Sequence, residues 1–146
     1  MTKALAGADA AKSIAGQFPD AVVSSTDDSV LVKREALLDV AGFLNKTAGL
    51  EFDYLLLLSG VDYLDYFEVV YHLVSMKNNQ SLVLKTRCHD RANASVPSVT
   101  SVWYGASFQE RETYDLMGIR FENHPDLRRI YLWDGFQGHP LRRDYL

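Results

Sequence analysis

The chain has 146 residues, of which 47% are hydrophobic, and it carries a formal net charge of −4 and a single cysteine. This length supports one compact domain with one core. The negative charge, without any lysine-rich run, argues against nucleic acid as a partner, and one cysteine excludes both an internal disulfide and the four thiolates that an iron–sulfur cluster usually takes.

Membrane insertion and secretion are also disfavoured by the sequence. The longest aliphatic run, residues 55–58, is far shorter than the roughly 20 residues that a membrane-spanning helix needs. The N-terminal segment lacks the apolar core of a secretion signal and contains Asp9, an acidic residue that a transit peptide would avoid. We therefore expect a chain that folds in the cytosol and does not insert directly into a membrane.

The N-terminal third predicts a helix, a hairpin and a second helix. Residues 8–18 place apolar side chains on one helical face, and the proline that follows ends the pattern. Residues 21–25 and 29–32 flank three polar turn formers and predict a β-hairpin. Apolar positions recur at three- and four-residue steps over residues 34–48, and Gly49 can adopt the left-handed backbone that closes a helix.

The middle of the chain predicts a three-strand meander. Three segments rich in aromatic, β-branched and leucine residues are separated by short turns: 51–59, 65–74 and 81–88. In the second segment Phe67, Val69 and Tyr71 alternate with Val70 and His72, which is typical of a half-buried strand. We expect helices to cover one face of this sheet, while the other face is mixed enough to meet either solvent or a neighbouring protein.

Beyond Arg91 the pattern changes to a loop and two helical segments. Residues 92–97 are loop-like, and residues 98–104 and 107–117 favour helices on either side of a glycine. Ser107 and Glu110 have the spacing of a capping box, in which two side chains satisfy the first free amides of a helix. The glycine after residue 117 is a plausible end for the second helix.

The last part of the chain, here called the C-terminal tail (residues 121–146), has no periodicity and is punctuated by asparagine, glycine and proline. Its aromatic content argues against simple disorder and predicts support from outside the domain. The expected fold is therefore a two-layer α+β domain, residues 1–120, with a mixed, mainly antiparallel sheet covered by helices. Residues 121–146 are expected to form an extended, irregular docking tail.

The basic residues of the C-terminal part are the clearest signal of a binding role. All six that follow Arg91 are arginine and none is lysine. A guanidinium pairs with carboxylates in two-pronged fashion and tolerates partial desolvation better than an ammonium, and arginine combined with aromatic residues is typical of protein interfaces. The alternative interpretation is a set of solvated surface charges, whose pairs usually contribute little to stability.

Histidine-containing patterns give weaker signals of chemistry. His124 and His139 each precede a proline in a near repeat, and although histidine can bind metal or move protons, proline holds each in an extended or turn conformation that suits a docking loop. Adjacent Cys88, His89 and Asp90 point to alternate sides of a strand and cannot meet as a catalytic triad; Cys88 is predicted in the core, with His89 outward.

No active site emerges from these residues. A glycine-rich phosphate loop follows none of the predicted strands, so nucleotide binding lacks its usual backbone device. The residues alone therefore favour an interaction module. A stand-alone hydrolase that uses His124, His139 and a nearby aspartate is the second hypothesis.

One long motif carries a resemblance. The segment Glu110-Arg-Glu-Thr-Tyr-Asp-Leu-Met-Gly-Ile119, followed by Phe121-Glu-Asn-His-Pro-Asp-Leu-Arg-Arg-Ile130, resembles the signature of the thirty-kilodalton subunit family of respiratory complex I, whose members are the C subunit in bacteria and the J subunit in chloroplasts. Asn123 stands where the family commonly has glycine before His-Pro, and asparagine tolerates left-handed backbone angles better than most residues.

The resemblance implies a scaffold subunit of the peripheral arm of the proton-translocating NADH:quinone oxidoreductase, with no cofactor in this chain. NADH or another donor, flavin, iron–sulfur clusters and quinone would belong to partner subunits. The implied partners are the forty-nine-kilodalton quinone-site subunit and other peripheral-arm subunits, at the cytoplasmic face of the cell membrane or its stromal or matrix equivalent. An equivalent subunit of a membrane-bound hydrogenase or of a ferredoxin- or F420-linked complex is the open alternative.

No catalytic, cofactor-binding or metal-binding residue is predicted in this chain. The residues expected to dock on partner subunits are charged or His-Pro residues of the signature and the tail: Glu110, Arg111, Asp115, His124, Pro125, Asp126, Arg128, Arg129, His139, Arg142, Arg143 and Asp144.

Overall fold

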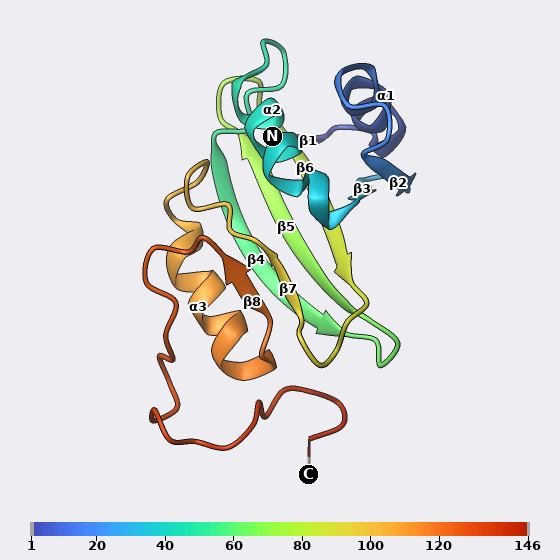
Figure 1. Ribbon diagram of the computed structural model, residues 1–146. Helices are drawn as coiled ribbons and strands as arrows, with labels where there is room; N and C mark the ends of the chain where they lie inside the picture. Colours follow the sequence, from blue (N-terminus) through green and yellow to red (C-terminus); the bar gives the residue numbers. More distant parts are fainter. Residues whose placement is uncertain (1, 146) are drawn as a thin grey trace.

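The computed structural model describes residues 2–145, and its centre is a six-stranded mixed sheet (Figure 1). The elements in chain order are β1 (Lys3–Ala4), α1 (Gly7–Gln17), β2 (Val22–Ser25), β3 (Ser29–Val32), the 3-10 turn η1 (Arg34–Ala36), α2 (Leu37–Lys46), β4 (Tyr54–Asp62), β5 (Phe67–Ser75), β6 (Gln80–Cys88), β7 (Ser95–Pro97), α3 (Ala106–Met117) and β8 (Arg120–Glu122). This arrangement confirms the predicted α+β class.

The strands of the main sheet lie in the order β2-β3-β6-β5-β4, and β1 also pairs with β6. The predicted hairpin (β2 and β3) and the predicted meander (β4, β5 and β6) are both antiparallel, whereas β3 joins β6 in parallel. Strands β7 and β8 form a separate two-stranded parallel sheet. The main sheet is therefore mixed but mainly antiparallel, as predicted.

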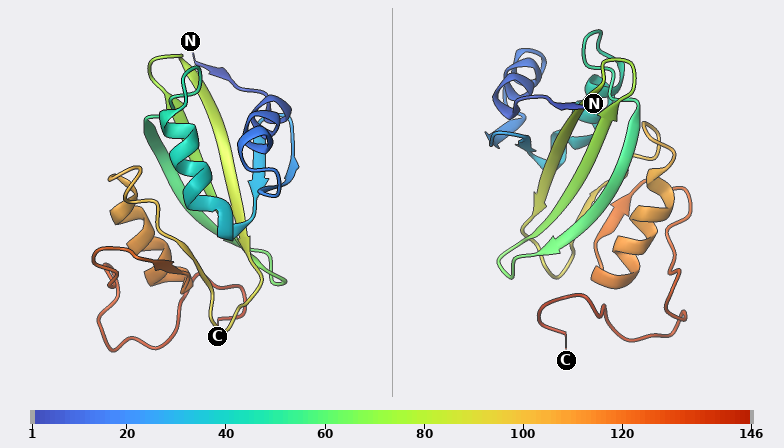
Figure 2. Two further views of the ribbon diagram at one scale, coloured as in Figure 1. Left: turned by 45° about the horizontal axis from the view of Figure 1, so that its top comes forward. Right: turned by 180° about the vertical axis from the view of Figure 1, so that it is seen from behind.

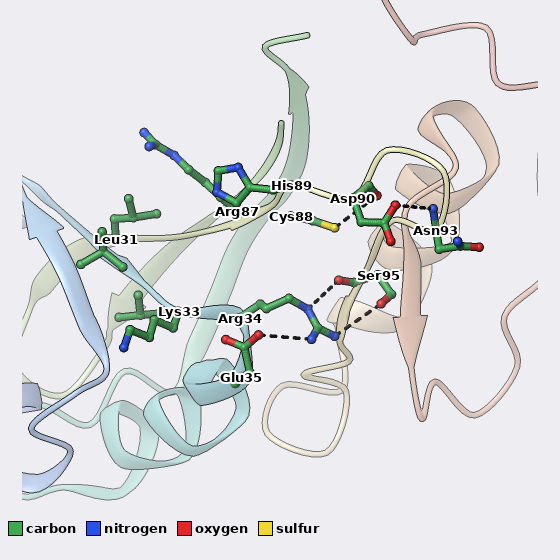
Figure 3. A pocket seen from close by; sticks show the side chains of 12 residues that line it. Leu31, Lys33, Arg34, Glu35, Arg87, Cys88, His89, Asp90, Asn93 and Ser95 are labelled. Atoms are coloured by element: carbon green, nitrogen blue, oxygen red, sulfur yellow. Dashed lines mark hydrogen bonds and ion pairs between the residues drawn. The ribbon is translucent and has the colours of Figure 1, made fainter. Parts of the chain in front are cut away.

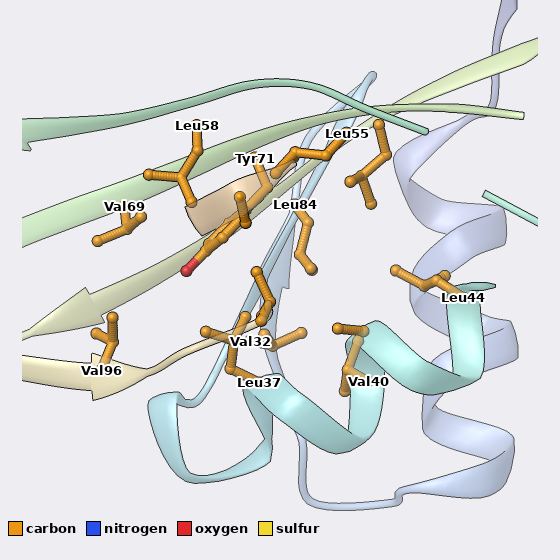
Figure 4. Packing of buried hydrophobic residues seen from close by; sticks show 14 of the residues in the cluster. Val32, Leu37, Val40, Leu44, Leu55, Leu58, Val69, Tyr71, Leu84 and Val96 are labelled. Carbon is orange, nitrogen blue, oxygen red and sulfur yellow. The ribbon is translucent and has the colours of Figure 1, made fainter. Parts of the chain in front are cut away.

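Helices α1 and α2 cover one face of the sheet, on which the core forms (Figure 2). The alternation predicted for β5 is confirmed, because Phe67, Val69, Tyr71 and Leu73 are all buried on that face. Apolar residues of α2 pack over the same face (Figure 4). The two helices touch through the rings of Phe18 and Phe43, whose centroids lie 5.8 Å apart.

Strand β4 extends further than the sequence pattern predicts. The pattern favours a turn at residues 60–62, but they belong to the strand, and the turn lies at residues 63–66. Gly60 allows α3 to pack closely against β4, because a Cβ atom at this position would lie 2.9 Å from both Met117 Sδ and Thr113 Cγ2. The turn itself contains Leu64 in a left-handed conformation, with φ of 69°.

The segment before α3 also differs from its prediction. Residues 98–104 form turns instead of a helix, and residues 95–97 of the predicted loop form β7. The predicted capping box is wrong, because the helix begins without a side-chain cap and Glu110 turns into the core. Residues 95–97 form a strand because they pair with β8, more than 20 residues further along the chain, and a local sequence pattern cannot reveal such a partner.

Helix α3 ends as predicted at Gly118, which adopts a left-handed conformation with φ of 75°. The next residues form β8, so Phe121, placed by the sequence in the C-terminal tail, lies buried in the core. From residue 123 to residue 145 the chain has no helix or strand. Asn123 also adopts a left-handed conformation, with φ of 67°, as the turn before His-Pro requires.

Candidate docking surface

The C-terminal tail runs back along α3 and then turns toward the end of β4 and β5 (Figure 1). Because the tail forms no helix or strand from residue 123 onward, its backbone and charged groups must find hydrogen-bond partners elsewhere. It does so at four places on its own domain, described in turn below. Each place centres on a buried or half-buried polar group of α3 or β4.

Asp115 is the strongest of these attachment points. Its buried carboxylate accepts the backbone N–H groups of Ile130, Tyr131 and Leu132 at 3.1, 2.8 and 3.1 Å, and Arg129 Nη1 at 3.0 Å. Burial alone would raise the pKa of this carboxyl, but the three N–H donors and the guanidinium hold it below its usual value. Asp115 thus fixes the path of residues 129–132 as a charged acceptor.

The tail also closes the C-terminal end of α3, whose last carbonyl groups have no partner within the helix. Leu141 N–H donates to Leu116 O at 2.9 Å, and Arg142 Nε donates to Met117 O at 2.7 Å. His139 Nδ1 lies 3.0 Å from Asp115 O, as a donor to that carbonyl. A guanidinium at this end is also favoured by the helix dipole.

Asp62, at the end of β4, holds the last residues of the tail. Arg91 binds both of its carboxylate oxygens, at 2.6 and 3.0 Å, and Arg143 N–H donates to it at 2.9 Å. The hydrogen bond from Arg91 is the main reason why the pKa of Asp62 lies well below its usual value. Arg91 also pairs with Asp144 at 3.2 Å, so the tail is joined to Asp62 directly through Arg143 N–H and indirectly through Arg91.

The fourth attachment involves His124 and the core side of α3. The His124 side chain is fully buried: Nδ1 accepts Asp126 N–H at 2.9 Å, and Nε2 lies 3.0 Å from Ser107 O and 3.9 Å from Glu110 Oε1. Glu110 accepts the Ser98 hydroxyl at 2.6 Å and the Val99 N–H at 2.9 Å. Burial raises the pKa of Glu110 to about 7, although these two donors oppose the shift.

The predicted docking residues are therefore brought together along α3, but most of them bond within the chain. Arg111 donates to the carbonyl groups of Arg128 and Arg129, at 3.2 and 3.3 Å. The members of the predicted set that bond to described residues through a side chain or a backbone N–H are Glu110, Arg111, Asp115, His124, Asp126, Arg128, Arg129, His139, Arg142, Arg143 and Asp144. Pro125 is exposed. Contact of any of these residues with a partner stays a prediction.

The tail presents large aromatic and apolar side chains outward, beside exposed charged residues such as Asp126 and Arg128. Tyr131, Trp133 and Leu141 are exposed, Trp133 to 69%, although the Trp133 ring packs edge-on against Phe136 at 4.9 Å. Two more large side chains, Tyr104 and Phe108, stand exposed at the start of α3. Exposed apolar patches mark interaction sites in soluble proteins, and we take these exposed side chains as candidate members of such a site. The candidate docking surface is this outer side of the α3 and tail unit.

Sequence reasoning missed several residues that shape this surface. Asp62 and Arg91 organise the end of the tail, but their partners lie 81 and 53 positions further along, at Arg143 and Asp144. No local pattern connects residues so far apart. The pattern around Tyr104 predicts a helix that does not form. Phe108 is the exception. Its position on the polar side of an amphipathic helix pattern could have indicated an exposed aromatic residue.

Other candidate chemistry is not assembled in the described part of the chain. Cys88 is buried and His89 is exposed, as predicted for neighbours on a strand. Residues 2–145 contain no group of three histidine, cysteine, aspartate or glutamate side chains placed to hold a metal ion. Among the same residues no helix is both long and apolar enough to cross a membrane.

Comparison with known proteins gives concordant results. Residues 30–146 match the family described as "Respiratory-chain NADH dehydrogenase, 30 Kd subunit". The chain is 45% identical to the NADH-quinone oxidoreductase C subunit of Roseiflexus sp. (strain RS-1), over 97% of this chain and 84% of that protein. It is 46% identical to the corresponding C subunit of Roseiflexus castenholzii, over 87% of this chain and 76% of that protein.

A solved structure shares the fold. A chain of the membrane-bound sulfane sulfur reductase, an archaeal respiratory membrane complex, matches with a TM-score of 0.75 and 23% sequence identity. The match covers 94% of this chain and 84% of the archaeal chain. At this identity the likeness concerns the arrangement of helices and strands.

Proposed function

We propose a scaffold role for this chain from the premise that it belongs to the thirty-kilodalton subunit family of respiratory-chain NADH dehydrogenases. In this role the chain is a subunit of the proton-translocating NADH:quinone oxidoreductase and stands in its peripheral arm, at the cytoplasmic face of the cell membrane or its organellar equivalent. It joins other subunits and carries out no redox step of its own. Flavin, iron–sulfur clusters and quinone belong to its partners.

The observation that carries this proposal is the C-terminal tail. A segment without secondary structure is costly to order, yet here four attachments hold it against α3 and the end of β4, while Tyr131, Trp133 and Leu141 are exposed. Tyrosine and tryptophan are common anchors of protein interfaces because they bury a large rigid area. A surface prepared in advance also lowers the entropy lost on binding.

We assign the forty-nine-kilodalton quinone-site subunit as the partner of this surface. In this assignment the predicted charged residues have two uses. Those on the inner side of the tail, such as Arg129 and Arg142, hold the surface in place. Those on the outer side, such as Arg128 and Asp126, remain exposed and available to the rim of an interface.

The test is native affinity purification of the chain followed by mass spectrometry of the proteins that co-purify. We expect homologues of the quinone-site subunit to dominate. The variant Trp133→Ala should reduce their recovery, while the isolated chain keeps its unfolding midpoint. Met76→Ala is the matched control, because Met76 is equally exposed at 69% but lies in the turn between β5 and β6.

Two outcomes would contradict the proposal. Co-purification of a hydrogenase large subunit in place of the quinone-site subunit would assign the chain to a related membrane-bound complex. Hydrolase activity of the isolated chain that disappears in His124→Ala or His139→Ala would support the stand-alone enzyme. In the latter case the histidine bonds to Ser107 and Asp115 would be secondary to catalysis.

A further inference from the structure

Two titratable side chains meet in the interior where the C-terminal tail begins to run along α3. Glu110 and His124 both have fully buried side chains, and Glu110 Oε1 lies 3.9 Å from His124 Nε2. On α3 itself, Arg111 donates to carbonyl groups of the tail and Glu112 lies beside β4. Among residues 2–145, no lysine or arginine forms an ion pair with Glu110. A negative charge on this carboxyl group would therefore be buried without a cation, which is costly.

The hydrogen bonds of His124 require a neutral ring. Its Nδ1 accepts the Asp126 N–H at 2.9 Å, and a nitrogen that accepts a hydrogen bond carries no proton. The proton of the neutral ring is therefore on Nε2, from which it is donated to Ser107 O at 3.0 Å. A second proton on the ring would leave the Asp126 N–H without its acceptor. His124 is thus neutral while the tail is attached.

The surroundings of Glu110 provide a place for a proton. Its Oε2 accepts the Val99 N–H at 2.9 Å, and its Oε1 lies 2.6 Å from Ser98 Oγ, which in turn lies 2.9 Å from Thr100 Oγ1. When Oε1 carries a proton, Glu110 donates to Ser98 Oγ, and the Ser98 hydroxyl donates to Thr100 Oγ1. Every polar atom of the group is then satisfied. Burial, which raises the pKa of Glu110 to about 7, favours the same neutral form.

The other titratable groups around this pair are neutral or already engaged. Tyr71 of β5 is fully buried (Figure 4), and burial raises its pKa well above the ordinary value, so it keeps its proton. Arg34 of η1 is turned toward Ser95 (Figure 3), to which it donates at 2.9 Å, and it also pairs with Glu122 of β8. The Asp126 carboxylate is in an exposed ion pair with a neighbouring arginine. Glu110 and His124 therefore share one titrating proton.

The two sides of this buried pair differ in how easily they open. One side is the core sheet, and the other is residues 123–127 of the tail, a segment without helix or strand. We propose that Glu110 and His124 form a proton-exchange pair, in which the proton is on Glu110 while residues 123–127 are attached and on His124 when they detach. On detachment Glu110 Oε1 releases its proton to water, and His124 Nδ1, vacated by the Asp126 N–H, takes up a proton from water. The products are a hydrated carboxylate and a hydrated imidazolium, and the number of bound protons is unchanged.

The consequence is an attachment that depends little on pH. Near pH 6 an exposed carboxyl group has lost its proton and an exposed imidazole has gained one. The attached and detached forms therefore bind the same number of protons, and neither is favoured by a change of pH. The inference goes beyond the proposed function and needs no partner subunit, so its test uses the isolated chain.

The test is hydrogen exchange of residues 121–128 at pH 5, 6 and 7, corrected for the intrinsic pH dependence of amide exchange. The reporters are the N–H groups of His124 and Asp126, which are hydrogen-bonded only while the segment is attached. For the wild type we expect the protection of these amides to change by less than about threefold between pH 5 and pH 7.

Single variants should uncover the two opposing titrations. In Glu110→Gln only His124 takes up a proton on detachment, so protection should rise about 30-fold from pH 5 to pH 7. In His124→Asn the side chain still offers an acceptor to the N–H two residues further on, and only Glu110 titrates, so protection should fall about 30-fold over the same range. The double variant should again be nearly independent of pH.

The matched control is Glu35→Gln, which removes a carboxylate that is 71% exposed and should leave the wild-type profile unchanged. A second measurement needs no variant: the carbon-13 signal of the Glu110 carboxyl group in the wild type should be that of a protonated acid at pH 6, when Glu35 is ionised. An ionised Glu110 signal at pH 6 would overturn the inference. So would a wild-type protection that changes more than threefold, or single variants whose profiles match that of the wild type.

Discussion

Helix α3 carries two fully buried carboxyl groups, and the surroundings on its two sides shift their pKa values in opposite directions. Glu110 faces the core, where it receives one hydroxyl and one N–H, and burial raises its pKa to about 7. Asp115 faces the C-terminal tail, where three N–H groups and a guanidinium outweigh burial and lower its pKa. Burial alone does not determine the charge of a carboxyl group. How deeply the group is removed from solvent and the number and charge of its donors decide it together.

The two regions on either side of α3 also differ in what holds them together. The sheet and α2 are held by apolar packing, in which side chains such as Leu84 and Tyr71 contribute to one shared core. The tail is held by a few polar attachments, each with a specific geometry. Loss of one attachment should therefore release a segment, whereas loss of one core side chain should weaken the whole domain.

The largest effect is expected for Asp115→Ala. The substitution leaves three N–H groups and the Arg129 guanidinium without their acceptor, which should cost about 4 kcal/mol. Because the tail can detach and become hydrated, we expect most of this cost to appear as local opening. Hydrogen exchange of the amides of residues 130–132 should accelerate far more than exchange in β5.

A matched control for this variant is Asp126→Ala. Asp126 is also in an ion pair with an arginine, but both partners are more than 60% exposed, and exposed pairs contribute little. Its exchange pattern should match that of the wild type. If Asp115→Ala instead left the exchange of residues 130–132 unchanged, the polar attachment would not be what positions the tail.

The next effect concerns pH and the core side of α3. Since the folded-state pKa of Glu110, about 7, lies above its ordinary value of 4.5, the folded protein binds this proton more tightly than the unfolded chain. The resulting stabilisation is present below pH 4.5 and is lost as the pH rises toward 7, by roughly 3 kcal/mol at most. Glu110→Gln should remove this dependence.

Denaturant unfolding of wild type and Glu110→Gln at intervals from pH 5 to pH 8 measures the difference. The wild type should lose stability relative to the variant across this range. Asp62 and Asp115, whose pKa values are lowered, contribute with the opposite sign, and their contribution is lost only as the pH falls below about 4. Parallel curves for the two proteins would show that Glu110 is ionised in the folded core throughout.

A smaller effect is expected where the tail closes α3. Arg142→Ala removes the donor to Met117 O and the positive charge at the helix end, at a cost of about 1.5 kcal/mol. Arg128→Ala, which removes an arginine of the same tail that is 67% exposed, should change the unfolding free energy by less than about 0.5 kcal/mol. Equal losses in the two variants would contradict the assignment of Arg142 as a helix cap.

The smallest effect tests the turn at Asn123. Its left-handed backbone, with φ of 67°, costs little for asparagine and less for glycine, but more for alanine. Asn123→Gly should be nearly neutral, and Asn123→Ala should destabilise by about 1 kcal/mol. Thermal unfolding of both variants decides the matter. A stable Asn123→Ala protein would show that the turn can adopt another conformation.

The parts of the fold that were predictable are those with a repeating pattern. Helix α2 and strand β5 follow the helical and alternating periods, and Gly118 ends α3 as its type suggests. Errors arose where tertiary contacts overrode local chemistry. Gly60 resembled a turn residue, but its role is to admit α3 against β4. The spacing of Ser107 and Glu110 resembled a cap, but the Glu110 carboxyl group is buried in the core, where it accepts the Val99 N–H.

The candidate site was predictable in composition but not in arrangement. The arginine and aromatic content of the tail predicts docking on a partner subunit, and this stays a prediction, since the printed bonds of the arginines Arg129 and Arg142 lie within the chain. The sequence could not show that Arg129 and Arg142 would be used on the inner side, toward α3, because that depends on where the tail runs. Nor could it pair Asp62 with Arg91 and Arg143, since neither separation has a local periodicity.

The bond between Asp62 and Arg143, which spans 81 residues, has a kinetic consequence. Closing so long a loop is entropically unfavourable until both ends have defined positions, so the sheet and α3 must form before the tail can attach. The order of folding should therefore end with residues 129–144. A chain whose sheet is misfolded cannot display the outer aromatic side chains in their final positions, and the candidate docking surface is completed only on a correctly folded chain.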